Sequence, residues 1–142
     1  MLSTVLLVNF NKTYRPWITS IRNSVFTVEQ LVDSNIDFDG QDDGAIHVLI
    51  RRNNDYIATG RMLSDGHIGR VAVLKEYREH GYGFKIVSAL INEAKNKYLN
   101  RVYLGAQLHA IDFYLKLGFL PYGEPYVEAN IEHISMEIIF NQ

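Results

Sequence analysis

A glycine-containing loop that leads directly into an amphipathic helix is the part of this sequence best suited to chemistry. The loop is Arg78-Glu79-His80-Gly81-Tyr82-Gly83, and the apolar side chains that follow it recur at helical spacing from 86 to 94. The first turn of a helix leaves backbone N–H groups unpaired, with the positive end of the helix dipole behind them. Gly81 and Gly83 let a phosphate approach the backbone, and Arg78 adds positive charge. The pattern therefore predicts an anion site.

The same glycines are also compatible with a tight turn that binds nothing. No Gly-Lys-Ser/Thr follows, which excludes a P-loop, and Ile86 stands where a dinucleotide fingerprint requires its third glycine. The loop alone leaves both interpretations open.

Two motifs together resemble those of a known family. The loop matches the Arg/Gln-x-x-Gly-x-Gly/Ala pyrophosphate loop of the GNAT acetyltransferase superfamily, and the stretch from Gln107 to Phe119 resembles that family's second signature. The stretches 25–30, 68–71 and 122–133 further resemble the ElaA-like branch. One departure is Gln107, where the family most often has Asn.

The resemblance implies acetyl-CoA as the acyl donor and assigns residues to its parts. The pantetheine arm would pair with the main chain of Val71, Ala72 and Val73 like an added strand. The diphosphate would lie on the backbone N–H groups of residues 78–83, which include Tyr82, and Glu79 and His80 would contribute main chain rather than side chain. Gln107 would bond the pantetheine, and Phe113 would pack the helix beneath it.

The resemblance also implies a catalytic role for Tyr114. By analogy its hydroxyl points at the thioester sulfur and protonates the departing thiolate, while a backbone N–H near Val71 or Ala72 polarises the carbonyl. From its position on an amphipathic helix alone, Tyr114 would equally be a core aromatic.

The sequence offers several candidates for the general base and for the residues that bind the acceptor substrate. Glu29 is the candidate base, in a region that lines the acceptor site in relatives, and Gln30 beside it is a candidate substrate contact. His109 and His133 are rivals for the base and candidate substrate contacts. Each of these residues also has a structural or solvated interpretation, and water itself is a further proton acceptor.

No metal site is expected. The histidines show no metal-ligand spacing, and the chain has no cysteine. The acidic stretch 37–43 lacks the closing Glu of a calcium loop, so we expect a solvated loop there.

The elements that must position these residues can be expected from hydrophobic periodicity and turn residues. Strands are expected over 3–10, 45–52, 56–63, 67–74, 101–106, 119–122 and 131–140, with helices after the Thr13 cap, over 28–35, on the 86–94 stripe and on the 110–117 stripe. This order indicates an α+β domain spanning 1–142, with a mostly antiparallel sheet and one βαβ crossover. The resemblance adds a three-layer α/β/α arrangement, splayed between strands 4 and 5.

Composition narrows the function classes. The 142 residues carry a net charge of -2 with no basic run, which argues against nucleic-acid binding. The apolar N-terminus lacks a positive region and a cleavage site and is too short to span a bilayer, so we expect no membrane partner. The absence of cysteine fits a cytoplasmic location.

We expect an enzyme that moves an acetyl group from acetyl-CoA to the amine of a small molecule by direct attack in a ternary complex. The alternative is a non-catalytic acyl-CoA-binding sensor, and transfer of longer acyl chains is a third interpretation. The apolar run 138–140 fits either a homodimer edge or buried core.

Overall fold

The computed structural model of this chain describes residues 2–141. Its elements follow the expected order, with short helical turns in the connections. In chain order they are β1 (Ser3–Val8), α1 (Arg15–Arg22), the π-helix η1 (Asn23–Glu29), α2 (Ser34–Asp37), η2 (Asp42–Gly44), β2 (Ile46–Arg52), β3 (Asp55–Met62), β4 (Ile68–Val73), η3 (Lys75–Tyr77), α3 (Tyr82–Asn96), β5 (Arg101–Gln107), η4 (Leu108–Ala110), α4 (Ile111–Lys116), β6 (Leu120–Glu128) and β7 (Ile131–Ile139). Within residues 2–141 no helix is long and apolar enough to cross a membrane.

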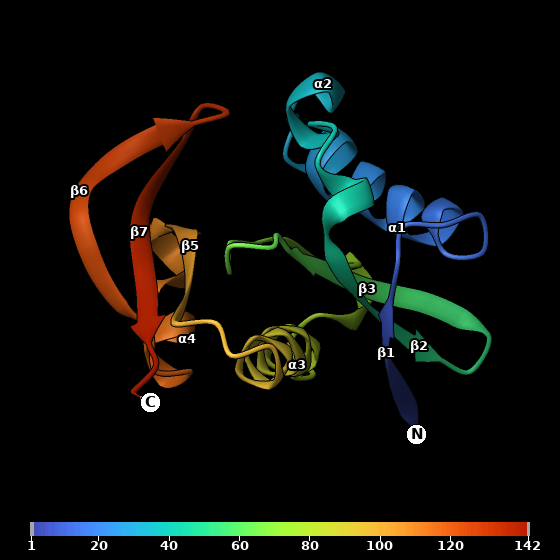
Figure 1. The fold of residues 1–142 in the computed structure, drawn as a ribbon. Helices are drawn as coiled ribbons and strands as arrows, with labels where there is room; N and C mark the ends of the chain where they lie inside the picture. Colours follow the sequence, from blue (N-terminus) through green and yellow to red (C-terminus); the bar gives the residue numbers. More distant parts are fainter. Residues whose placement is uncertain (1, 142) are drawn as a thin grey trace.

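The strands form two antiparallel sheets that diverge where they meet. One sheet has the order β1-β2-β3-β4 and the other β5-β7-β6. Among the described residues, an isolated parallel bridge joins the two sheets, from His67 just before β4 to Tyr103 of β5. Beyond it the sheets open apart, and α3 lies between them at the closed end (Figure 1). The predicted α+β fold, with a splay between the fourth and fifth strands, is confirmed.

Helices cover both faces of the first sheet. Successive side chains of a strand point to opposite faces, and β2 shows this clearly: Val48 and Ile50 pack in the core that contains α3, while Leu49 packs with Ile18 and Ile21 of α1. The amphipathic stripe of α3 is buried as predicted, in the same core as residues of β5. Full burial of each large aliphatic side chain contributes roughly 1.5–3 kcal/mol.

Two elements differ from their predicted bounds. The helix expected over 28–35 is instead a π-helix that continues α1 to Glu29, followed by the single turn of α2. β6 extends to Glu128, well past the predicted end at 122. Pro121 and Pro125 lack the N–H that a strand interior needs, but β6 is an edge strand, where a missing N–H is tolerated.

The acidic stretch 37–43 is not the solvated loop that we expected. Asp37 and Asp42 are buried. Arg22 donates to Asp37 Oδ1 at 3.1 Å and to Asp42 Oδ1 at 2.6 Å. Arg61 of β3 contacts Asp42 at 3.0 Å and Asp39 at 2.6 Å. The expectation was wrong because the arginines that pair with this segment lie far away in the sequence. Through these ion pairs the segment joins the α1 layer to the sheet.

Candidate active site

A β-bulge in β4 shapes the site. Thr59 pairs with Ala72 and Arg61 with Gly69, so Gly60 alone stands opposite Arg70 and Val71. Arg70 has a left-handed φ of 51°, which non-glycine residues rarely adopt. Gly60 is required here because a Cβ would lie 2.5 Å from Ile86 Cγ2 of α3. The bulge takes two residues of β4 out of the regular ladder.

The outer edge of β4 is open. β4 ends its sheet, and beyond the His67–Tyr103 bridge no described strand pairs with it. Its outward N–H and C=O groups can therefore pair with an extended ligand. These groups include the main chain of Val71 and the N–H of Val73, whose carbonyl already accepts from Arg78. The Ala72 side chain is buried against the α1 layer.

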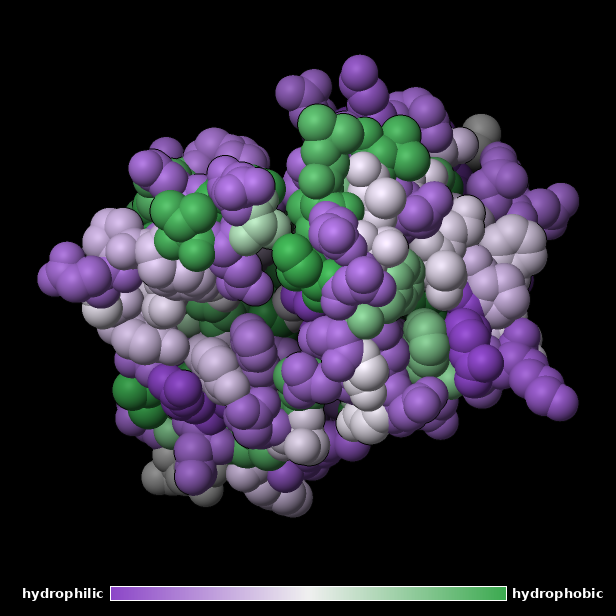
Figure 2. Space-filling model, turned by 90° about the horizontal axis from the view of Figure 1, so that it is seen from above, coloured by the Kyte–Doolittle hydropathy of each residue, from purple (hydrophilic) through white to green (hydrophobic). Residues whose placement is uncertain are grey.

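A cavity of about 330 Å³ lies between the diverging sheets. Seen from above, it is a hollow between two lobes with hydrophobic side chains inside it (Figure 2). The predicted site residues that line it are Gln30, Val71, Gln107, His109, Tyr114 and His133. Its remaining wall includes the charged side chains Asp37, Arg70 and Glu128, which the sequence analysis did not assign. Arg70 stands within the 68–71 stretch that carried the family resemblance, so a signal for it was present.

Tyr114 reaches this cavity from α4. Its ring makes edge contacts with Phe113 and Phe119, at centroid distances of 5.0 and 5.7 Å. Phe113 in turn faces Gly83, so it packs α4 against the start of α3. Burial raises the pKa of Tyr114 to about 12. The phenol is therefore a neutral proton donor over the whole physiological range.

His133 has a fixed tautomer. Its Nδ1 lies 2.7 Å from the carbonyl oxygen of Ile131, and a carbonyl only accepts, so Nδ1 carries the hydrogen. The neutral ring then has its lone pair on Nε2. Tyr126 stacks on the ring at 5.5 Å, and Gly105 makes room for the Tyr126 hydroxyl, which would lie 2.0 Å from a Cβ at that position.

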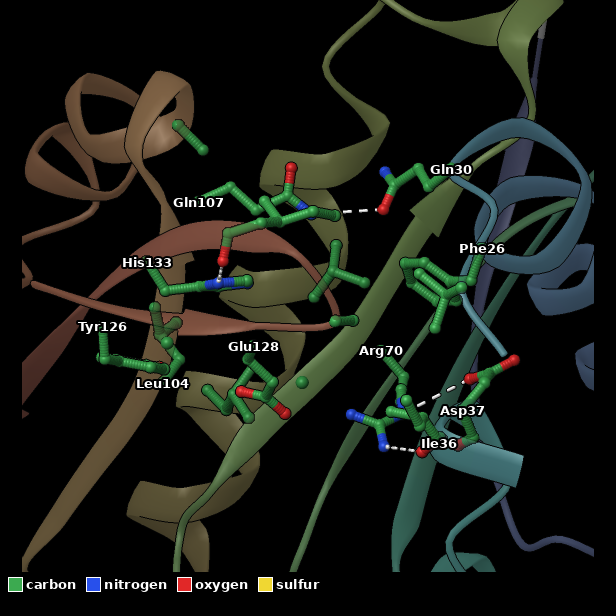
Figure 3. A pocket seen from close by; sticks show the side chains of 18 of the residues that line it. Phe26, Gln30, Ile36, Asp37, Arg70, Leu104, Gln107, Tyr126, Glu128 and His133 are labelled. Atoms are coloured by element: carbon green, nitrogen blue, oxygen red, sulfur yellow. Dashed lines mark hydrogen bonds and ion pairs between the residues drawn. The ribbon is translucent and has the colours of Figure 1, made fainter. Parts of the chain in front are cut away.

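One polar contact crosses the open end of the cleft. Gln107 at the end of β5 donates to Gln30 Oε1 at 3.3 Å, as Figure 3 shows. Gln107 thus bonds Gln30, the candidate contact to the acceptor substrate, in this structure. Its predicted contact to pantetheine stays a prediction.

The predicted phosphate loop forms a separate groove next to the cavity. Val73, Arg78, Glu79, Gly81, Tyr82, Gly83 and Phe113 line it, and His80 does not. Gly81 caps α3 with a φ of 81°, and no side chain caps the helix. Its first-turn N–H groups are therefore available to an anion. These features fit a diphosphate.

Glu29 lies away from the cavity walls. Arg78 donates two hydrogen bonds to its carboxylate, at 2.5 and 2.7 Å, and a third to the Val73 carbonyl at 3.0 Å. The hydrogen bonds and charge of Arg78 lower the pKa of Glu29. This geometry favours a structural tie between η1 and the phosphate loop over the predicted role as base. Among residues 2–141, no three His, Asp or Glu side chains gather to hold a metal ion.

Comparison with known proteins decides the family. Residues 18–140 match the acetyltransferase (GNAT) domain. The chain belongs to the GNAT acetyltransferase family. As a GNAT member it is an acyltransferase whose donor is an acyl-CoA.

Individual relatives place the chain in the ElaA-like branch of the GNAT family. It is 33% identical to protein ElaA of Escherichia coli (strain K12) over 127 residues, 84% of this chain and 83% of ElaA. It is 36% identical to protein YyaT of Bacillus subtilis (strain 168) over 122 residues, 82% of each chain. The crystal structure of E. coli ElaA superimposes with a TM-score of 0.86 at 29% identity, covering 96% of this chain and 99% of that one. An acyl-CoA N-acyltransferase from Pseudomonas aeruginosa gives 0.84 at 28% identity with the same coverage.

Proposed function

We propose that this protein transfers an acetyl group from acetyl-CoA to the amine of a small molecule by direct attack in a ternary complex. The observation that carries the proposal is the open edge of β4. It runs from the cavity that contains Tyr114 to the groove at the uncapped start of α3. An extended thioester donor with a diphosphate needs this combination: an open strand edge for its arm, a proton donor for its thiolate and an anion site for its diphosphate.

Bound acetyl-CoA would supply the acyl group as an activated thioester. The chain's own residues do the rest. The main chain of Val71 and Val73 binds an extended arm, and the N–H groups at Gly81–Gly83 with Arg78 hold negative charge. The Tyr114 hydroxyl holds the proton that a thiolate leaving group needs.

A proton must also leave the amine. Among the sequence candidates, His133 fits best because its Nε2 has the free lone pair and its ring lines the cavity. We therefore assign the proton-accepting role to His133 Nε2, and to Glu29 the positioning of Arg78.

Calorimetry and a thiol assay test the proposal together. We expect purified protein to bind acetyl-CoA and to release free thiol when an amine is added. Binding without thiol release from any amine would support the sensor instead. Absence of binding would refute the assignment of the β4 edge and the α3 groove.

A further inference from the structure

Three charged side chains of the cavity, Asp37, Arg70 and Glu128, have no part in the proposed reaction, and Asp37 is already paired with Arg22 and Arg70. Arg70 comes from the bulge of β4 and Glu128 from the end of β6. Figure 3 shows them on opposite walls of the cavity. No hydrogen bond or ion pair within residues 2–141 engages the Glu128 carboxylate. Their positions suit them to recognise the acceptor.

The Arg70 guanidinium is held rigidly on one side. Its Nε donates to the Asp37 carbonyl at 3.0 Å, and its Nη2 donates to the Ile36 carbonyl at 3.0 Å and to Asp39 at 3.2 Å. These bonds come from the acidic segment, which is itself fixed by buried arginines. They also hold Arg70 in its unfavourable left-handed conformation.

The other side of the guanidinium is free. Nη1 makes no hydrogen bond to any described residue, and in Figure 3 it points across the cavity. A guanidinium presents its N–H donors in a fixed planar fork. With Nε and Nη2 bonded, the N–H groups of Nη1 have one fixed direction, and the side chain is only 23% exposed. A partly buried donor of this kind favours an anionic acceptor atom.

The charged side chains that line the cavity indicate which acceptor molecule can bind there. Asp37 and Asp39 offset part of the charge of Arg70, but its Nη1 still offers N–H donors that suit a carboxylate, whereas the Glu128 carboxylate attracts an ammonium group at the facing wall. The same cavity is also lined by the apolar side chains of Phe26, Val32 and Ile131. A small molecule with one carboxylate, one amine and an apolar remainder matches all three features.

We propose that Arg70 determines acceptor specificity and that the acceptor is an amine that carries a carboxylate beside it, as an α-amino acid does. The inference rests on the proposed function. The acceptor carboxylate binds Arg70 Nη1, which leaves the amine toward the opposite wall, where Glu128 and His133 lie (Figure 3).

Matched pairs of amines test the inference. Each amino acid is compared with its decarboxylated amine: phenylalanine with phenethylamine, alanine with ethylamine, lysine with 1,5-diaminopentane. We expect kcat/KM for the acid to exceed that for the amine by about 10–100-fold in at least one pair, the effect of one hydrogen bond to a charged group. Equal or reversed values in every pair would overturn the inference.

Variants assign the preference to its residue. Arg70→Gln is expected to remove most of the acid-over-amine ratio, and Arg70→Lys to retain part of it. Arg101→Gln removes an arginine paired with Glu137 outside the cavity and should leave the ratio unchanged. A ratio that survives in a folded Arg70→Gln protein, checked by its melting curve, refutes the role of Arg70.

A binding experiment on the unaltered protein avoids the risk that Arg70 variants do not fold. With coenzyme A present, 3-phenylpropionate should bind at least about tenfold more tightly by calorimetry than its neutral amide. Equal affinity contradicts the inference. The proposed function fails separately, through absence of acetyl-CoA binding or of thiol release with every amine.

Discussion

At the scale of single residues, the Tyr114 hydroxyl combines two properties that a general acid needs. Tyr114 lines the cavity, and burial keeps its hydroxyl protonated by raising the pKa of Tyr114 to about 12. Tyr114→Phe keeps the ring contacts with Phe113 and Phe119 and removes only the hydroxyl group. We expect kcat to fall by about 10²–10⁴-fold, with acetyl-CoA affinity by calorimetry within about twofold of the unaltered protein.

The raised pKa of Tyr114 adds a constraint on the pH profile. An acid works only while protonated, so its ionisation would lower kcat only as the pH approaches about 12. A fall of kcat near pH 9 that disappears in Tyr114→Phe would contradict the raised pKa of Tyr114.

His133 and Glu29 are distinguished by parallel variants. His133→Gln removes the Nε2 lone pair from the cavity wall, so we expect kcat at neutral pH to fall by about 10-fold or more. Glu29→Gln removes the partner of Arg78, so we expect a changed Kd for acetyl-CoA and an unchanged pH dependence of kcat. If Glu29→Gln instead removes the acidic limb of the kcat profile, Glu29 is the base after all.

At the scale of elements, the backbone at the start of α3 is the proposed binding site of the diphosphate. Gly83→Val places a side chain where a diphosphate would approach, while the new Cβ would lie 3.5 Å from Phe113 Cζ, an ordinary contact. We expect the melting temperature to change little and acetyl-CoA affinity to fall by at least about tenfold. S-acetylpantetheine, which lacks the diphosphate, is the control ligand: an equal loss for both ligands would show that the groove does not hold the diphosphate.

Elements with a strong local signal could be predicted from the sequence. The α3 stripe and Gly81–Gly83 are encoded within a few neighbouring residues, and so is the Tyr114 helix. β6 was underestimated because Pro121 and Pro125 are unfavourable in most strands, and its edge position is a property of the whole sheet. The bulge at Arg70 depends on the register with β3, which a single sequence does not specify.

At the scale of the whole molecule, the acidic segment joins layers that are distant in the sequence. Arg22 of α1, Arg61 of β3 and Arg70 of β4 all bond to residues 37–42. The same segment therefore holds the α1 layer on the sheet and orients Nη1 of Arg70 toward the cavity. Stability and acceptor recognition depend on one set of ion pairs, so acid should weaken the fold through these carboxylates.

The direction of that effect follows from the pKa shifts. Hydrogen bonds from Arg61 hold the pKa of Asp39 well below its usual 3.8, and Arg22 and Arg61 overcome burial to lower that of Asp42. A carboxylate with a lowered pKa stabilises the fold above its unfolded pKa, and this contribution is lost as pH falls toward the folded value. Burial raises the pKa of Asp37, so this one carboxyl group has the opposite effect on the pH dependence of stability. The two carboxylates with lowered pKa outnumber it.

We therefore expect the melting temperature to fall as the pH drops below about 4, and to fall less steeply in Asp39→Asn, which no longer has that proton to bind. Asp43→Asn is the matched control because Asp43 is exposed in the same segment, and it should keep the steep dependence. Melting curves between about pH 3 and pH 7 measure all three proteins. If Asp39→Asn and Asp43→Asn lose stability with the same slope, the ion pairs of Asp39 do not stabilise the fold, and Arg70 is positioned by its bonds to the Ile36 and Asp37 carbonyls instead.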